Sequence, residues 1–226
     1  MKMKTINKKH IIIFILLFAI PLLADIAAIF HLPDTIPMHF GTNGEADRYG
    51  SKFEIFIFPL FSLIIGAGSF IIGRISSKNE SSTKNNETLS LICGECTSVI
   101  LAVINIYFLY ISLNGITNVY SPEIDLGRLT SLLFGITLII LGNIMPKAKM
   151  NSYFGFRCSW TRKNEEIWKK SQHFAGIASI ITGIVLFISG FFFKEAYILI
   201  ILFGLMTIMT AVDLVYAYRI SHNEQP

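Results

Sequence analysis

Six long apolar runs limit what this chain can fold into more than any other feature. They occupy residues 11–30, 53–72, 89–113, 129–145, 174–193 and 196–217. A helix of about twenty residues is about 30 Å long, which matches the hydrocarbon thickness of a bilayer. The chain is 53% hydrophobic and 15% charged, and its charged residues are concentrated between the runs. The sequence therefore predicts an all-α, polytopic membrane protein with six transmembrane helices.

The distribution of basic residues predicts which loops face the cytoplasm. If the N-terminus lies inside, the inner segments hold fifteen of the nineteen lysines and arginines, and the outer segments hold four. Cytoplasmic loops of multi-pass proteins carry such an excess of basic residues. We expect both termini to be cytoplasmic. We also expect the first run to be an uncleaved span, because a secretory apolar region is only about 7–15 residues long.

The composition between the runs predicts three regions. Residues 1–75 contain two spans joined by an outer loop, 32–52. Residues 76–88 are rich in Ser, Asn and Lys without apolar periodicity, which is typical of a flexible linker, here on the cytoplasmic side. Residues 89–226 contain four spans and a basic cytoplasmic connector, 146–173.

Glycines recur seven residues apart in two of the spans. Gly135 and Gly142 lie in the fourth, and Gly176, Gly183 and Gly190 lie in the fifth. Seven residues are close to two helical turns, so each set lies on one helix face. Small residues let membrane helices approach closely, and we therefore expect spans four and five to pack as an antiparallel pair. The alternative is that glycine is simply frequent in membrane helices.

The connector holds seven of the nineteen basic residues and both tryptophans. A proline favours a helix end at its start, a glycine suggests unusual dihedrals, and Asn164 predicts the start of a helix that continues into the fifth span. We interpret the tryptophans as interfacial anchors. For the other residues we prefer an ordered structural loop over a partner-binding site. The candidate residues are Asn143, Pro146, Asn151, Gly155, Arg157, Trp160, Thr161 and Trp168.

The outer loop is dense in turn residues. Two prolines stiffen its beginning, glycines permit tight turns, and charged residues can pair locally. We expect an ordered loop, and ordered loops on rigid scaffolds often carry recognition. The candidate residues are Pro33, Pro37, His39, Gly44, Asp47, Arg48, Tyr49 and Lys52.

We expect no metal, no cofactor and no enzymatic activity. Neither a Ser/His/Asp order nor an HExxH motif is present, and basic–aromatic repeats typical of nucleic-acid binding are missing. A hydrogen-bonded structural histidine is our interpretation of the outer loop. Two metal sites remain as alternatives. The first would use His31 and His39 with Asp34 or Glu45, and the second would use Cys93, Cys96, Cys158 and His173.

Four carboxylates in or near the spans leave a second class of function open. Asp25, Glu95, Asp125 and Asp213 could serve a small-molecule or proton-coupled transporter or a membrane enzyme. We place Asp25, Glu95 and Asp213 near helix ends, where hydration is inexpensive, which argues against a proton path.

The two patterned loops together resemble the SdpI immunity protein family, which carries an N-terminal DUF1648 segment. The first pattern comprises Leu32, Pro33, Ile36, Pro37, His39, Phe40, Gly44, Asp47, Arg48, Tyr49 and Lys52. The second comprises Gly142, Asn143, Met145, Pro146, Asn151, Gly155, Arg157, Trp160, Thr161, Glu166 and Trp168. The chain departs from the family at Cys158, where a small residue or proline is commoner.

This resemblance implies a bacterial multi-pass protein of the cell membrane that protects its producer from a secreted antimicrobial peptide toxin. It also implies that toxin binding can be reported to a cytoplasmic transcriptional repressor. Our hypothesis is that the toxin meets the outer loop, that spans four and five shift, and that the connector changes its exposure. The expected partners are the toxin, the repressor and membrane lipid, with no direct contact to nucleic acid.

Overall fold

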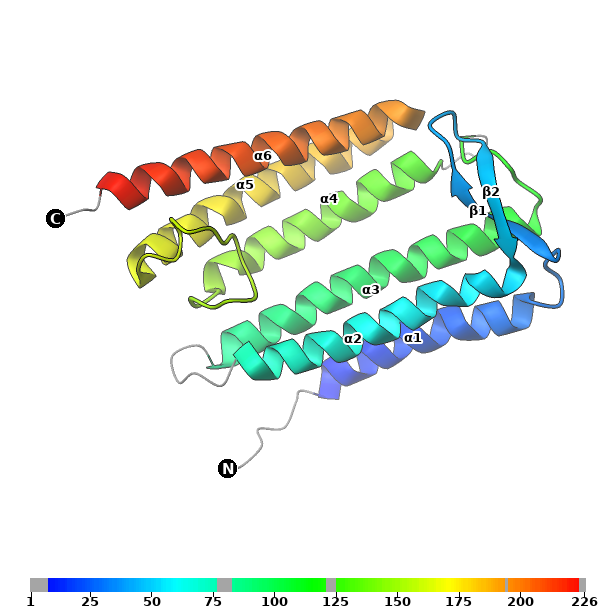
Figure 1. Cartoon of the computed structure of the whole chain (residues 1–226), viewed down its shortest axis with the longest axis horizontal. Helices are drawn as coiled ribbons and strands as arrows, with labels where there is room; N and C mark the ends of the chain where they lie inside the picture. Colours follow the sequence, from blue (N-terminus) through cyan, green and yellow to red (C-terminus); the bar gives the residue numbers. More distant parts are fainter. Residues whose placement is uncertain (1–7, 77–82, 121–124, 194, 224–226) are drawn as a thin grey trace. The chain divides into compact units, whose positions relative to one another are not determined.

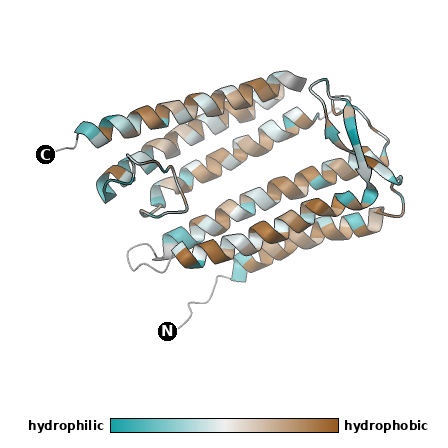
Figure 2. Cartoon of the chain, viewed as in Figure 1, coloured by the Kyte–Doolittle hydropathy of each residue, from teal (hydrophilic) through white to brown (hydrophobic). Residues whose placement is uncertain are grey.

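A computed structural model describes residues 8–76, 83–120, 125–193 and 195–223. Six helices in this part of the chain are long and apolar enough to cross a membrane. They are α1 (Lys8–Ala28), α2 (Ile57–Ser76), α3 (Thr83–Leu113), α4 (Leu126–Ile144), α5 (Glu165–Phe192) and α6 (Glu195–Asn223) (Figure 1). Figure 2 shows hydrophobic residues along these helices and hydrophilic ones concentrated toward helix ends and loops. The predicted all-α architecture of a multi-pass membrane protein is confirmed.

The start of α3 differs from the sequence prediction. The helix begins at Thr83, so residues 83–88 are helical where we predicted the end of a flexible linker. Residues 77–82 of that linker lie outside the described part of the chain. The early turns of α3 carry polar residues, and the apolar pattern that marks a membrane span starts only after them. The reason for this polar start is found in the connector, described below.

By contacts between residues, the chain divides into two compact units. Unit 1 contains residues 1–69 and 93–123, and unit 2 contains residues 70–92 and 124–226. The boundary runs through α2 and α3, whereas the sequence suggested regions that meet in the linker at 76–88. That earlier division rests on composition and stays a prediction. The two units are described separately.

Unit 1 carries a β-hairpin next to the ends of its helices (Figure 1). Strand β1 (Thr35–Phe40) pairs antiparallel with β2 (Ala46–Ser51), and the 3₁₀ helix η1 (Lys52–Phe56) leads into α2. The pairing has register shifts between Pro37 and His39 and between His39 and Phe40, and the adjacent residues Ile36 and Pro37 are both buried. Ile36 is fully buried, as are Ile55 of η1 and Ile111 of α3. The predicted ordered loop is therefore a hairpin on an apolar base.

Buried polar pairs join α1 to α3 inside unit 1. The amide of Asn105 donates to the two carboxylate oxygens of Asp25 over 3.1 and 3.4 Å, and both residues are 0% exposed. Toward the start of α1, His10 Nδ1 lies 2.7 Å from Glu95 Oε1. Our expectation that Asp25 is hydrated at a helix end was wrong, because the amide of Asn105 takes the place of water.

In unit 2, α4 and α5 touch backbone to backbone. A Cβ atom at Gly142 would lie 2.5 Å from the carbonyl oxygen of Gly176, and a Cβ at Gly135 would lie 2.8 Å from that of Gly183. Approach this close is possible only without side chains. The predicted glycine packing of the fourth and fifth spans is confirmed. We call this contact the glycine seam, comprising Gly135, Gly142, Gly176 and Gly183.

Candidate functional site

The first patterned loop folds into what we call the hairpin cap, residues 32–56. Its turn depends on Gly44, whose φ of 78° disfavours any other residue. A Cβ at this position would also lie 2.4 Å from the ring of Tyr120. The Tyr120 hydroxyl donates to the Thr42 carbonyl over 3.1 Å. Gly44 therefore permits the turn and also leaves space for the Tyr120 ring that packs against it.

The loop after α3 is joined to the hairpin turn by backbone hydrogen bonds. The Ala46 amide donates to the Thr117 carbonyl, and the Val119 amide donates to the Gly44 carbonyl, each over 2.8 Å. Glu45 and Asn118 form an isolated antiparallel bridge between them. We had assigned this loop no role. Backbone hydrogen bonds leave little trace in side-chain patterns, which explains why the sequence did not reveal it.

Three side-chain pairs lie on the outside of the cap. His39 Nδ1 lies 2.5 Å from Asp47 Oδ1, Arg48 Nη2 lies 2.6 Å from Glu54 Oε2, and Lys52 Nζ lies 3.0 Å from Asp34 Oδ1. The charged residues of this loop pair locally as predicted, and His39 is hydrogen-bonded to Asp47. At least one partner in each pair is well exposed, so the pairs contribute little to stability.

Glu54 has a second role at the start of η1. Its carboxylate accepts from the Ser51 amide, and the Ser51 hydroxyl accepts from the Phe53 amide, so that a capping box begins the helix. A Cβ at Gly50 would lie 2.2 Å from this carboxylate. Gly50 thus leaves space for Glu54 to reach back across β2 and meet Arg48.

The structure separates the candidate residues of the cap into two groups. His39, Asp47, Arg48, Tyr49 and Pro33 are exposed, whereas others are buried or partly buried within the hairpin. The second group consists of Pro37, Gly44 and Lys52. Only the first group is available to a partner.

The connector forms an ordered loop built on the side chain of Asn151. Its amide oxygen accepts from the backbone amides of Tyr153 and Phe154 over 2.7 and 2.6 Å. Its amide nitrogen donates to the carbonyl of Lys149 over 2.7 Å. An asparagine that replaces backbone partners in this way fixes a tight turn without regular secondary structure.

A glutamine of α5 clamps the middle of the connector. Gln172 accepts from the Phe156 amide over 2.9 Å and donates to the Phe156 carbonyl over 2.8 Å. Gly155, with a φ of 91°, lies directly beside it, and a Cβ there would lie 2.2 Å from the Gln172 oxygen. The unusual dihedrals predicted for Gly155 are confirmed, and they serve this clamp.

An asparagine at the start of α3 makes a matching clamp. Asn86 accepts from the Lys149 amide over 3.1 Å and donates to the Lys149 carbonyl over 3.3 Å, and it is fully buried. Its neighbour Asn85 donates to the Lys147 carbonyl over 3.3 Å but is exposed. The end of the segment that we predicted to be a flexible linker thus holds the connector. Asn86 is buried against backbone groups, and a polar side chain in this role contributes nothing to an apolar pattern.

Trp168 is a further structural contact rather than an interfacial anchor. It is 2% exposed, and its indole N–H donates to the Ala148 carbonyl over 2.8 Å. Trp160 is half-buried, with its ring centroid 5.3 Å from that of Tyr218 on α6. The anchoring interpretation was wrong for Trp168, because the helix that begins after Asn164 turns this side chain inward.

The remaining candidate residues of the connector are either buried within the loop or exposed at its surface. Thr161 is fully buried and bonds to the amide and carbonyl of Cys158. Arg157 donates to the Ser152 carbonyl while its side chain remains exposed. Asn143 is exposed on α4 and lies outside this network. The connector is therefore an ordered structural loop with a basic surface.

The two proposed metal sites receive no support. Among residues 8–76, 83–120, 125–193 and 195–223, no group of three or more His, Cys, Asp or Glu side chains could hold a metal ion. Cys93, Cys96 and Cys158 are all free thiols.

Comparisons with known proteins match both patterned regions. Residues 16–63, which include the whole hairpin cap, match the domain of unknown function DUF1648. Residues 147–217, which include the connector, match the SdpI/YfhL protein family. The chain is also 29% identical over 211 residues to the immunity protein SdpI of Bacillus subtilis strain 168, covering 93% of this chain and 95% of that protein. The resemblance to the SdpI family is confirmed.

A second relative matches only part of this chain. An uncharacterized protein of Archaeoglobus fulgidus is 38% identical over 72 residues, which cover 32% of this chain and 37% of that protein. No solved structure matches the chain. The SdpI region and the DUF1648 region lie in one multi-pass membrane protein, and together they coincide with the connector and the hairpin cap described above.

Proposed function

We propose that this chain is a membrane immunity protein that protects the cell from a secreted peptide toxin. The observation that carries the proposal is the similarity to an immunity protein along nearly the whole chain, including both patterned regions. An enzymatic role has no comparable support, because no catalytic constellation was recognised in the sequence. The buried Asp25 is accounted for by its bond to Asn105, which weakens the case for a transporter.

In this proposal the hairpin cap faces outward and meets the toxin. The excess of basic residues in the alternate loops supports this orientation. His39, Asp47, Arg48 and Tyr49 offer charge and an aromatic ring on the exposed side of the cap. Arginine and tyrosine are the residue types that most often dominate binding energy at interfaces.

The connector faces the cytoplasm in the same proposal and offers a basic surface to a transcriptional repressor. Arg157, Arg162 and Lys169 are exposed there. The clamps at Asn86 and Gln172 hold the backbone of this surface in one arrangement. A signal therefore needs a helix that moves, rather than a loop that refolds.

Helix α3 is the element best placed to carry such a signal. At its start Asn86 holds the connector, and nearer its end Asn105 and Phe108 pack beneath the hairpin cap, with the Phe108 ring centroid 5.9 Å from that of Phe40. Toxin binding that shifts α3 would reach the connector through a buried hydrogen-bonded residue. This route complements a movement of α4 and α5.

The experiment that tests the proposal is a protection assay. Cells expressing the chain or its Arg48→Ala variant at equal membrane levels are challenged with the secreted peptides of the organism that carries the gene. We expect the wild type to protect and Arg48→Ala to protect less. Lys170→Ala is the matched control, because Lys170 also forms an exposed ion pair, 2.9 Å from Glu166, but lies on α5. Equal killing with and without the wild-type chain would refute the proposal.

A further inference from the structure

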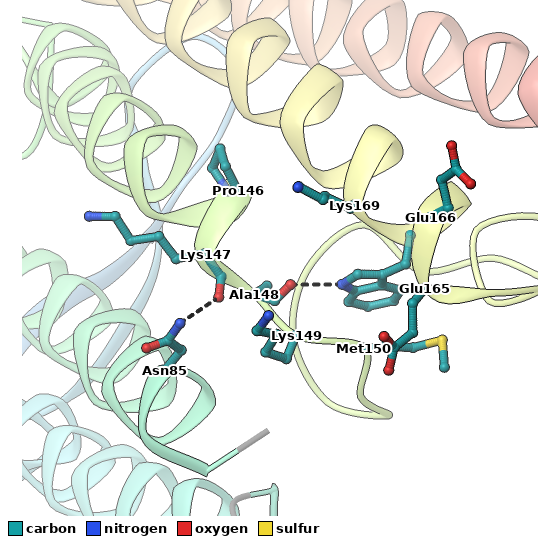
Figure 3. Close-up of a pocket in the computed structure, with 10 residues that line it drawn as sticks. Asn85, Pro146, Lys147, Ala148, Lys149, Met150, Glu165, Glu166 and Lys169 are labelled. Carbon is teal, nitrogen blue, oxygen red and sulfur yellow. Dashed lines mark hydrogen bonds between the residues drawn. The ribbon is translucent and has the colours of Figure 1, made fainter. Parts of the chain in front are cut away.

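A pocket in unit 2 opens between the end of α4, the start of the connector and the first turns of α5. Its volume is about 570 Å³. The short 3₁₀ helix η2 (Met145–Lys147) forms one side, and Asn85 of α3 closes another (Figure 3). The pocket lies where membrane-spanning helices end, which is the level of phospholipid headgroups.

Three lysines line this pocket: Lys147, Lys149 and Lys169. In Figure 3, Lys169 extends from α5 toward the end of α4, Lys149 lies on the other side of the hydrogen bond between Ala148 and the indole, and Lys147 extends toward the side of Asn85. Their ammonium groups form no ion pair with any carboxylate among the described residues. The lysines are held in position by their backbones, since Asn85 and Asn86 bond to Lys147 and Lys149.

The acidic residues of the pocket only partly offset this charge. Glu166 is already paired with Lys170, which lies 2.9 Å away. Glu165 is the other carboxylate on the lining. Three lysines against one carboxylate outside an ion pair leave an excess of two positive charges, which suits an anionic ligand.

The rest of the lining is apolar. Pro146 and Met150 contribute accessible side chains, whereas Trp168 is 2% exposed and its indole N–H is already bonded to the Ala148 carbonyl. A ligand for this pocket therefore combines an anionic group for the lysines with carbon surface for the proline and methionine. A phosphodiester attached to glycerol and acyl chains has this combination.

We propose that this pocket binds the phosphate ester of an anionic phospholipid headgroup. Lys147, Lys149 and Lys169 supply the positive charge for the lipid phosphate. A lipid in this pocket would rest against the backbone that Asn86 and Trp168 hold, and it would stabilise the connector. This inference does not require the immunity function proposed above, although Lys169 belongs to both surfaces.

The test measures lipid retention by the purified full-length protein. Native mass spectrometry is used to titrate phosphatidylglycerol and phosphatidylcholine onto the wild type, and soluble glycerol phosphate serves as a probe without acyl chains. We expect phosphatidylglycerol to bind most tightly. Each lysine near a charged headgroup contributes about 1 kcal/mol, so Lys149→Gln/Lys169→Gln should weaken phosphatidylglycerol binding by about 25-fold. Glu165→Gln should strengthen it, because a like charge is removed.

Lys8→Gln is the control for charge alone, since Lys8 is an exposed lysine of α1 in unit 1, and it should retain wild-type binding. Thermal unfolding of each variant checks that it is folded. Equal retention of phosphatidylglycerol by the wild type and the double variant would overturn the proposal, as would equal retention of the two lipids. If glycerol phosphate binds as tightly as phosphatidylglycerol, the ligand is a soluble phosphate ester and the lipid assignment is wrong.

Discussion

The hairpin cap and the connector are both rich in motif residues, but different interactions hold them. In the cap, charged side chains form exposed pairs on the outside, and the side-chain exposure of Arg48 and Glu54 is 57% and 31%. The connector is instead held by the fully buried amide side chains of Asn86 on α3 and Gln172 on α5, which bond to its backbone groups.

This difference separates residues that specify the fold from residues that remain available to a partner. A buried amide that satisfies a backbone N–H and C=O is expensive to remove, because both groups are left without partners. An exposed ion pair contributes about 0–1 kcal/mol. Substitutions in the connector should therefore change stability, whereas substitutions of the outer cap charges should change binding. Four predictions test this contrast.

The largest loss of stability is expected for Gly155→Ala. The new side chain would have to adopt a φ of 91° and would meet the oxygen of Gln172, which breaks the clamp. Backbone strain and the lost hydrogen bonds together should cost about 3 kcal/mol. Thermal unfolding in detergent measures the change. A wild-type unfolding midpoint would mean that the clamp does not hold the connector.

Asn86→Ala should cost about 2 kcal/mol, because it leaves the backbone amide of Lys149 without its partner and removes one of the two donors to the Lys149 carbonyl. Asn85→Ala is its matched control, since Asn85 is an exposed neighbour with a single 3.3 Å bond. This control should change stability by less than about 0.5 kcal/mol. Similar losses in the two variants would contradict the role assigned to burial.

Gly44→Ala tests whether a residue of the cap contributes to stability as residues of the connector do. A φ of 78° and contact with the Tyr120 ring should cost about 1–2 kcal/mol. The loss should stay local, because the ring lies at the tip of the hairpin. Hydrogen exchange is expected to quicken at the amides of Ala46 and Val119 and to remain slow at Lys149. Faster exchange at all three sites would instead indicate a global effect.

The smallest effect on stability is expected for Arg48→Ala. Loss of the exposed pair with Glu54 should change the free energy of unfolding by about 0.5 kcal/mol. Protection against the toxin should nevertheless fall by about tenfold if Arg48 contributes to binding as interface arginines commonly do. Unfolding and protection are measured on the same preparation of cells and membranes. A large loss of stability with unchanged protection would reverse the contrast between cap and connector.

The sequence predicted the features that follow from apolar length, helix capping and glycine spacing. The six spans, the helix that begins after Asn164 and the glycine seam all follow from local rules, and all three are present. The charge pairing within the cap could be predicted in part, because residues of opposite charge lie close together in the sequence.

Features that depend on distant backbone groups could not be predicted in this way. Asn86 lies in a polar segment that resembles a linker, and its partner, Lys149, is far away in the sequence. The loop after α3 is joined to the cap by backbone hydrogen bonds of Thr117 and Val119, which any residue except proline could make. Trp168 was misread because interfacial and buried tryptophans have the same flanking charges. In each case the missing information was the position of a backbone N–H or C=O in space.

The glycine seam determines which movements of α4 and α5 are inexpensive. Beside its glycines, Ile139 of α4 and Ile180 of α5 already lie within about 3 Å of where a Cβ would sit on the opposite helix. Turning either helix about its own axis would push these branched side chains into the neighbouring main chain. The two helices can therefore tilt or slide only as one rigid body, and the connector that joins them must move with them.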